Sequence, residues 1–325
     1  MQVASDEEDL RLRVHRRAVG ADGVVVLELR HPAGNDLPAW SPGAHVDLIL
    51  PDGLVRQYSL CGDPQNRTAW QIGVLREPDG RGGSAYIHDE VREGHEIDVR
   101  GPRNNFPLVP APRYIFLAGG IGITPILPMA AAAEQAGAQW EFHYGGRSRT
   151  SMAFLDTLET LEATAEHGST VDLHPQDEVG LIDLPRILGT PRPGTKVYCC
   201  GPEPLLSAVE AACADWPAGT LHVERFAPKE QGERVLSGDF EVELTLEGVT
   251  LTVPPDRSIL DVVDEAGVFV LSSCQEGTCG TCETRVLHGE VDHRDSLLTP
   301  EERATSDTMF ICVSRAACPK LVLEL

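Results

Sequence analysis

The chain has 325 residues, of which 42% are hydrophobic and 24% charged, a composition typical of a soluble globular protein. Its length predicts two or three domains, each of which can bury its own core. No apolar run approaches the ~18 residues that a membrane-spanning helix requires. The formal net charge of -23 disfavours nucleic acid and anionic membranes as partners, because both would repel the chain.

Short β-branched segments separated by turn signals characterise the first hundred residues. Strands are predicted at residues 24–29, 45–50 and 54–60, with Pro51-Asp52-Gly53 as the turn between the last two. This pattern is typical of an antiparallel β-barrel, which we place at residues 1–110.

From residue 111 the pattern changes to alternating strands and helices. An apolar strand at residues 114–118 leads through a glycine turn into an alanine-rich helix at residues 125–135. Further strands are predicted at residues 139–144, 170–174 and 196–200. Because strands that alternate with helices form a parallel sheet, residues 111–226 are predicted to be an α/β domain.

A polar segment with proline and glycine, residues 227–237, predicts an interdomain linker. The α+β domain that follows it spans residues 238–325. A hairpin is predicted from the strands at residues 240–246 and 249–253, and Ser258 is expected to cap a helix at residues 259–266.

Four cysteines of this last domain share a telling spacing. Cys274, Cys279 and Cys282 are followed, after twenty-nine intervening residues, by Cys312. The resulting C-x4-C-x2-C…C pattern is that of plant-type [2Fe–2S] ligands, and residues 272–282 supply small residues and glycines for a tight loop. A zinc site usually has short paired spacings at both ends, and unligated cysteines would not fall into this register by chance. We therefore predict a [2Fe–2S] cluster and an electron-transfer function.

The remaining cysteines are expected to be reduced, packed thiols: Cys61, Cys199, Cys200, Cys213 and Cys318. Free cysteines, thiolate ligands and an acidic start at residues 1–9 without a signal-peptide core favour a cytoplasmic location.

The acidic charge is concentrated around the predicted cluster. Residues 237–325 contain 17 acidic and 6 basic residues, a difference of -11. This excess serves either solubility alone or the steering of the domain toward a basic face on a redox partner.

Two turns at strand ends are candidates for nucleotide binding. Residues 119–125, Gly-Gly-Ile-Gly-Ile-Thr-Pro, follow a buried strand and open a helix, where backbone N–H groups can meet a pyrophosphate. The turn departs from G-x-G-x-x-G, and glycine is also common in such turns for its backbone freedom alone. Cys200-Gly201-Pro202 lies at the carboxyl edge of the sheet, the usual place of a nucleotide ring, although a tight turn would also explain it.

Two segments near the barrel suit a flavin. Arg56, Tyr58 and Ser59 place a cation, a ring and a hydroxyl within four residues, and on a strand Arg56 and Tyr58 share a face. They fit a flavin phosphate and the plane of an isoalloxazine. Residues 81–84, Arg-Gly-Gly-Ser, add a second arginine, a hydroxyl and bare backbone before a helix that begins near Ala85. Each segment alone would also be an ordinary surface strand or turn.

The order of these motifs identifies a family. Arg-x-Tyr-Ser, Gly-Gly-Ser, Gly-Pro-Arg-Asn-Asn-Phe-Pro-Leu at residues 101–108, the glycine turn, Cys-Gly-Pro, Glu-Arg-Phe and the ferredoxin cysteines occur in succession. Together they resemble the phthalate dioxygenase reductase and vanillate demethylase reductase family over essentially the whole chain. The domain order is a flavin barrel, a nucleotide domain and a C-terminal ferredoxin domain.

The resemblance implies cofactors and a place for each candidate residue. FMN and its phosphate would meet Arg56, Tyr58, Ser59, Arg81, Gly83 and Ser84, with Phe226 beside the ring. The nicotinamide nucleotide would meet Gly120, Thr124 and Cys200, with Arg147 near its ribose or phosphate. Ser148 and Arg149 leave NADPH possible, because a further cation can hold a 2′-phosphate, but NADH is favoured.

In this interpretation the chemistry belongs to the cofactors and no side chain acts as a general base. Hydride passes from the nicotinamide to the flavin, and electrons then pass singly to the cluster. The predicted function is the reductase component of a Rieske-type or haem oxygenase that acts on an aromatic or related small molecule, and a monomer suffices for it. The alternatives are a free-standing reductase of flavin, iron or quinone, and a redox-sensing iron–sulfur module.

The histidines receive no role at this stage. His15, His45, His88, His143 and His174 show no metal-ligand spacing, so surface or core positions are the favoured interpretation.

Overall fold

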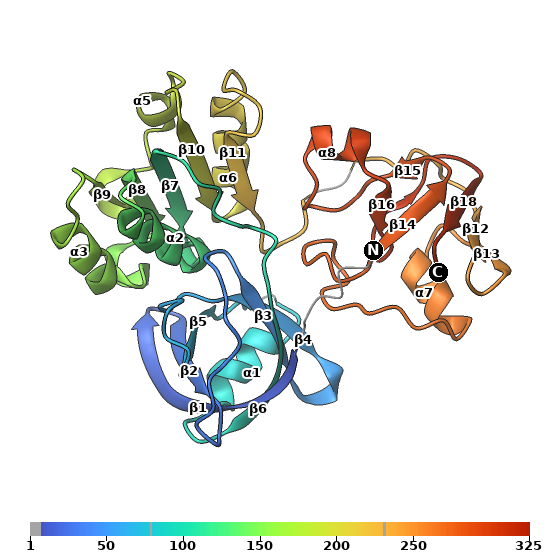
Figure 1. Cartoon of the computed structure of the whole chain (residues 1–325), viewed down its shortest axis with the longest axis horizontal. Coiled ribbons are helices and arrows are strands. Elements are labelled where there is room, and N and C mark those ends of the chain that lie inside the picture. The colour runs from blue at the N-terminus through green and yellow to red at the C-terminus, as the bar shows by residue number, and fades with distance from the viewer. Residues whose placement is uncertain (1–7, 79, 230–231) are drawn as a thin grey trace. The chain divides into compact units, whose positions relative to one another are not determined.

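The computed structural model of the chain describes residues 8–78, 80–229 and 232–325. They form two compact units, one that ends at Glu224 and one from Arg225 to Leu325 (Figure 1). The predicted domain borders and the linker at residues 227–237 stay predictions. Residues 230 and 231 of that linker, and residues 1–7 of the predicted acidic start, lie outside the described residues.

The first part of the first unit is an antiparallel sheet with strand order β4-β3-β6-β1-β2-β5. Its strands are β1 (Glu8–Ala21), β2 (Val24–Arg30), β3 (His45–Ile49), β4 (Val55–Ser59), β5 (Trp70–Leu75) and β6 (Glu96–Arg103). A bridge between Leu60, next after β4, and Ile72 of β5 joins the two edges, as the predicted barrel requires. Alternate residues of β2 point into a core that includes Leu27 and Trp70.

A short helix, α1 (Gly83–Asp89), packs against β5 of this barrel (Figure 1). It begins two residues before the predicted start at Ala85. Gly82 precedes it with a φ of 85°, a left-handed conformation that glycine adopts without strain, so the chain can turn sharply into the helix.

The second part of the first unit is a parallel sheet with strand order β11-β10-β7-β8-β9. Its strands are β7 (Arg113–Gly119), β8 (Gln139–Gly146), β9 (Thr170–Pro175), β10 (Thr195–Cys200) and β11 (Leu221–Glu224). Its helices are α2 (Ile123–Gln135), α3 (Leu155–Ala163), α4 (Gln176–Val179), α5 (Leu184–Leu188) and α6 (Glu203–Ala212). The predicted α/β architecture is confirmed.

The parallel sheet is buried on both faces because its central strand is apolar throughout. Phe116 of β7 packs into the core beneath α2, whereas Leu117 packs on the other face with side chains of α5 and α6. This arrangement is typical of parallel sheets, which helices cover on both sides. It also brings the carboxyl ends of all five strands to one edge.

The second unit contains a sheet with strand order β13-β12-β18-β14-β16. The helices and strands of the second unit are β12 (Phe240–Leu244), β13 (Val249–Val253), α7 (Ile259–Glu265), β14 (Glu283–His288), β15 (Val291–Asp292), α8 (Pro300–Thr305), β16 (Thr308–Phe310), β17 (Arg315–Ala316) and β18 (Lys320–Leu323). Strands β15 and β17 pair with each other outside the larger sheet. The predicted hairpin pairs β12 with β13, and the Ser258 hydroxyl accepts from the Asp261 N–H at the start of α7.

Among the described helices, none combines the length and the apolar character needed to cross a membrane.

Candidate functional site: flavin, nucleotide and cluster residues

The four cysteines of the predicted cluster site come together in the second unit. All four side chains are buried, and thiol–thiol contacts join Cys274 to Cys279 and to Cys312, and Cys312 to Cys282. These contacts hold the pKa of the Cys274 thiol below its usual value and raise the pKa of Cys312, because neighbouring sulfurs compete for protons. The predicted spacing therefore corresponds to one compact group of four sulfur ligands.

Backbone amides around these sulfurs fit a thiolate-bound cluster. The N–H groups of Glu276 and Thr278 donate to Cys274 Sγ at 3.2 and 3.4 Å, and Thr281 N–H donates to Cys279 Sγ at 3.4 Å. Such donors stabilise negative charge on sulfur. The loop reaches this shape through positive φ angles at Gln275 (57°), Gly277 (69°) and Gly280 (77°), which explains its glycines.

The predicted flavin-phosphate residues converge at the start of α1. Arg56 of β4 donates from Nη1 to the Val55 carbonyl at 2.7 Å and from Nη2 to the Arg81 carbonyl at 2.9 Å. Its side chain crosses Gly83 so closely that a Cβ on Gly83 would overlap Arg56. Ser84 Oγ accepts from the Glu77 N–H at 3.0 Å. The structure thus joins the two segments that the sequence identified separately.

Tyr58 and Ser59 follow Arg56 along β4. Tyr58 is partly buried and packs against the barrel core, and this burial raises the pKa of its hydroxyl. Ser59 is buried, and its hydroxyl hydrogen-bonds to the carboxylate of Glu224 at the end of β11. The end of β4 therefore faces the parallel sheet within the first unit.

The glycine turn after β7 is shaped by close backbone approaches. It forms a 3-10 turn, η2 (Gly120–Gly122), before α2. Gly120 has a φ of 53°, and its carbonyl accepts from the Tyr144 hydroxyl at 3.1 Å. A Cβ on Gly122 would overlap the carbonyl group of Cys200. The turn can therefore pass this close to β10 because Gly122 has no side chain. This packing requirement explains the glycine even without a bound nucleotide.

Thr124 and Cys200 lie buried on either side of this turn. The Thr124 hydroxyl donates to the Ile121 carbonyl at 2.9 Å, and its methyl group faces Gly73 of the barrel. Cys200 Sγ lies 3.9 Å from Oε2 of Glu224, its register partner on β11. Burial raises the pKa of the Cys200 thiol, so the neutral form is favoured.

Glu224 is the residue that sequence reasoning passed over. It stands in the quoted Glu-Arg-Phe motif, but only the pairing of β10 with β11 reveals its contacts with Cys200 and Ser59. Burial raises the pKa of the Glu224 carboxyl to about 8, while the hydrogen bonds from Cys200 and Ser59 oppose this shift. A carboxyl of this kind is largely protonated at neutral pH.

Two predicted residues, Arg147 and Phe226, belong to other segments of the chain. Arg147 is exposed after β8, and its carbonyl accepts from the Asp177 N–H at 3.3 Å. Phe226 belongs to the second unit and is 45% exposed. Among the cysteines outside the cluster set, Cys61, Cys199 and Cys213 are buried, Cys318 is partly exposed, and none of the four is in a disulfide.

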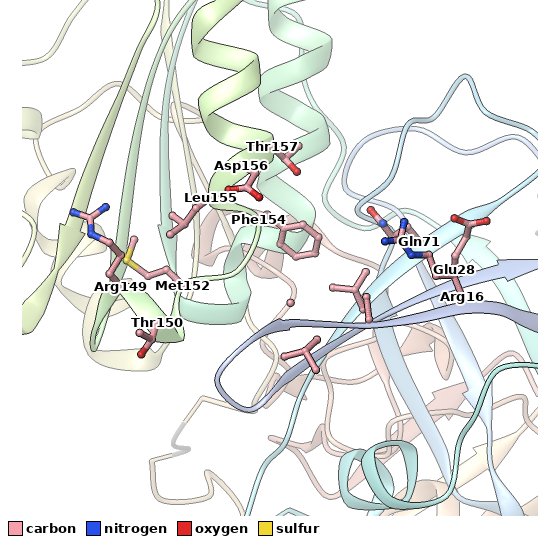
Figure 2. A pocket seen from close by; sticks show the side chains of 14 residues that line it. Arg16, Glu28, Gln71, Arg149, Thr150, Met152, Phe154, Leu155, Asp156 and Thr157 are labelled. Carbon is pink, nitrogen blue, oxygen red and sulfur yellow. The ribbon is translucent and has the colours of Figure 1, made fainter.

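The structure also contains a pocket of 460 Å³ within the first unit. Figure 2 shows Arg16, Glu28 and Gln71 from the barrel on one side and Phe154 from the segment after β8 on the other. Arg149, the cation that leaves NADPH possible, lines this pocket, whereas the residues predicted to bind FMN do not.

Comparisons with known proteins match two parts of the chain to known domains. Residues 242–317 match the 2Fe-2S iron-sulfur cluster binding domain, and residues 116–211 match the oxidoreductase NAD-binding domain. The phenoxybenzoate dioxygenase subunit beta of Ectopseudomonas oleovorans is 44% identical over 327 residues and covers 100% of both chains. The solved structure of phthalate dioxygenase reductase is 37% identical, with a TM-score of 0.70 over 98% of both chains.

The chain belongs to the phthalate dioxygenase reductase family. A further solved structure, an intact type IV self-sufficient cytochrome P450 monooxygenase, is 46% identical with a TM-score of 0.90. It covers 98% of this chain, which spans 41% of that protein. The matched domains and the family confirm an NAD(P)H-dependent oxidoreductase with a nicotinamide nucleotide and a [2Fe–2S] cluster as cofactors, and its relatives are reductase subunits of oxygenase systems.

Proposed function

We propose that the chain delivers electrons from NADH to a terminal oxygenase, and that Cys274, Cys279, Cys282 and Cys312 hold the cluster at its exit. The observation that carries this proposal is the group of four buried sulfurs with backbone N–H donors at Cys274 and Cys279. When bound, FMN and the cluster supply the redox chemistry, which converts a two-electron donor into single electrons. The protein contributes the binding geometry and the electrostatics.

The flavin would be held at the end of β4. Arg56 is oriented by two backbone carbonyls, which leaves its positive charge beside the start of α1 to attract a phosphate. Arg81, Gly83 and Ser84 would complete this side. Tyr58 and Ser59 would orient the ring system, and Phe226 would lie beside it.

The nicotinamide would be positioned by Cys200, and the pyrophosphate by Gly120 and Thr124. Glu224 would position the Cys200 and Ser59 side chains through its carboxyl group, as a mostly neutral residue at pH 7. Arg147 would face the ribose. These roles rest on the close packing of Gly122 against Cys200, which brings the turn and the thiol to one edge of the sheet.

The choice of NADH over NADPH rests on the partner of Arg149. Its guanidinium lies 3.2 Å from the Glu178 carboxylate in an exposed ion pair. A cation that is already paired attracts a 2′-phosphate less strongly. We expect kcat/KM for NADH to exceed kcat/KM for NADPH. Glu178→Gln should raise kcat/KM for NADPH and so reduce the difference.

The terminal partner would dock on the acidic second unit. Exposed carboxylates such as Asp261, Asp264 and Glu265 line α7, and they would steer a basic face of a Rieske-type or haem oxygenase. A monomer in the cytoplasm suffices for this route, and nine cysteines outside any disulfide are consistent with a reducing compartment. Coupled turnover with the oxygenase should therefore fall as ionic strength rises.

An absorbance spectrum before and after anaerobic addition of NADH tests the electron route. Both flavin and cluster bands should bleach, and the protein should contain FMN and about two irons per chain. Cys279→Ser should abolish reduction of cytochrome c, a one-electron acceptor, and spare NADH-driven flavin reduction. Cys318→Ser, outside the ligand set, is the matched control.

The alternatives make different predictions. A free-standing flavin or quinone reductase would keep its full activity in Cys279→Ser. A redox-sensing module would show negligible turnover with any acceptor. Unchanged cytochrome c activity in Cys279→Ser would exclude the proposed route through the cluster.

A further inference from the structure

Three side chains with metal-binding groups meet on one face of the parallel sheet, away from the residues assigned above. His143 of β8 is the register partner of Asp172 on the edge strand β9. His174 lies two residues after Asp172, and on a strand such residues point to the same face. The three ligand atoms all lie within 4.8 Å of one another.

The distances fit one small cation. His143 Nδ1 lies 3.6 Å from Asp172 Oδ2, and His174 Nε2 lies 3.4 Å from the same oxygen. Ligand atoms of a tetrahedral zinc ion, at about 2.0–2.2 Å from the metal, lie roughly 3.3–3.6 Å apart. The two separations from Asp172 Oδ2 are therefore close to those that a bound ion would need.

Three of the imidazole nitrogens are buried and make no hydrogen bonds of ordinary length within the part of the chain that the structure describes. The side chains of His143 and His174 are only 8% and 10% exposed. Among the described residues, both ring nitrogens of His143 and Nε2 of His174 have no hydrogen-bond partner. Buried polar atoms without hydrogen bonds are costly and rare in native proteins, so these nitrogens, two of which face the Asp172 carboxylate, call for an explanation.

The surroundings supply the outer contacts of a metal site. Glu141 Oε2 lies 3.7 Å from His143 Nε2, the nitrogen that faces away from Asp172, and Arg192 holds Glu141 at 2.5 and 3.2 Å. A carboxylate behind a ligating histidine is a frequent feature of metal sites. Arg186 Nη2 lies 3.1 Å from Asp172 Oδ2. This arginine is 62% exposed, so it can turn toward solvent when a cation takes its place.

We propose that His143, Asp172 and His174 bind a divalent transition metal, with Zn²⁺ as the best-fitting ion and water as the fourth ligand. Two imidazoles and one carboxylate suit zinc, whereas Mg²⁺ and Ca²⁺ require oxygen ligands. The ion links the edge strand β9 to β8, so it stabilises the nucleotide domain. It takes no part in electron transfer.

Zinc titration of the chelator-treated, desalted holoprotein tests this proposal by calorimetry and metal analysis. The wild-type chain should bind one Zn²⁺ that His143→Gln and His174→Gln bind at least about 100-fold more weakly. His167→Gln is the matched control, because His167 lies in the same domain but pairs with Glu134. It should bind zinc like the wild type.

A second measurement distinguishes zinc binding at this site from zinc binding to the cysteine thiols. Zinc should raise the melting temperature of the wild-type chain and of His167→Gln, but not that of His143→Gln. NADH-driven flavin reduction should be equal in all of these variants, which would show that they are folded. If a histidine variant does not fold, Asp172→Asn replaces it in the zinc titration. Equal zinc binding by the wild-type chain and the His143→Gln/His174→Gln double variant would place the metal on thiols and overturn the proposal.

Discussion

The Cys200 thiol lies 3.9 Å from Oε2 of Glu224, and the hydroxyl of Ser59 hydrogen-bonds to the same carboxylate. These three side chains come from β10, β11 and β4, so one carboxyl group links the parallel sheet to the barrel. Its burial raises the pKa of Glu224 to about 8. The protonation state of this residue therefore changes within the range in which the protein can be studied.

Glu224 should make stability depend on pH. Because its pKa in the folded state is raised above the unfolded value, its contribution is fully present below about pH 4.5 and is lost as pH rises through about 8. The free energy of unfolding of the wild-type chain, minus that of Glu224→Gln, should decrease over this window. The slope is at most about 1.4 kcal/mol per pH unit.

Denaturation at pH 5, 7 and 9 measures this difference. The control is Glu159→Gln, which removes an exposed carboxylate on α3 and should give a constant offset. If the free energies of unfolding of the wild-type chain and of Glu224→Gln differed by the same amount at pH 5, 7 and 9, the pKa of Glu224 would not be raised in the folded protein.

The sequence predicted the strands and the group of four cysteines because local signals suffice for both. A β-branched run defines strands such as β2, an apolar run defines strands such as β7, and the four cysteine positions follow a characteristic spacing. The start of α1 was predicted two residues late, because the left-handed conformation at Gly82 lets the helix begin at Gly83.

The contacts between side chains of neighbouring strands could not be predicted from the sequence. Glu224 meets Cys200 through the register of β10 and β11, and His143 meets Asp172 through the register of β8 and β9. Neither pair has a characteristic spacing along the chain. The histidines show no metal-ligand spacing along the chain, yet His143 and His174 meet Asp172 in the folded structure.

Gly122→Ala should weaken nicotinamide binding and stability together. The added methyl group would overlap the backbone of Cys200, and overpacking of this kind costs about 1–3 kcal/mol. Gly122 has a φ of -62°, so backbone strain plays no part. We expect a lower melting temperature and a higher KM for NADH. Gly238→Ala, where a Cβ meets nothing within 4 Å, should change neither, and an unaltered KM in Gly122→Ala would contradict the proposed packing.

Arg56→Gln should reduce the affinity for FMN about 10- to 100-fold, because charged hydrogen bonds contribute about 1.5–3 kcal/mol. Gly83→Ala should have a similar effect, since its methyl group would push the Arg56 side chain away from the Arg81 carbonyl. Fluorescence of released FMN during dialysis measures the loss. Arg11→Gln removes an exposed arginine of the same barrel and should retain FMN. Full retention by Arg56→Gln would remove this residue from the flavin site.

Gly277→Ala and Gly248→Ala form a pair that separates backbone strain from crowding at the cluster loop. Both glycines have similar positive φ angles, 69° and 67°, so alanine costs roughly 1–2 kcal/mol at either position. Only at Gly277 would the new methyl group also meet Val313 Cγ2, at 2.5 Å, and the Asp295 backbone, at 3.1 Å. A Cβ at Gly248 points into open space.

Iron content and the visible circular dichroism of the cluster should therefore fall in Gly277→Ala and stay normal in Gly248→Ala. The four ligand positions depend on the path of the loop between Cys274 and Cys279, and crowding at Gly277 displaces that path. Both variants should keep FMN and NADH-driven flavin reduction, because the proposed flavin and nucleotide residues, except Phe226, belong to the first unit. Equal iron loading in the two variants would show that the loop tolerates the displacement and that strain alone limits this position.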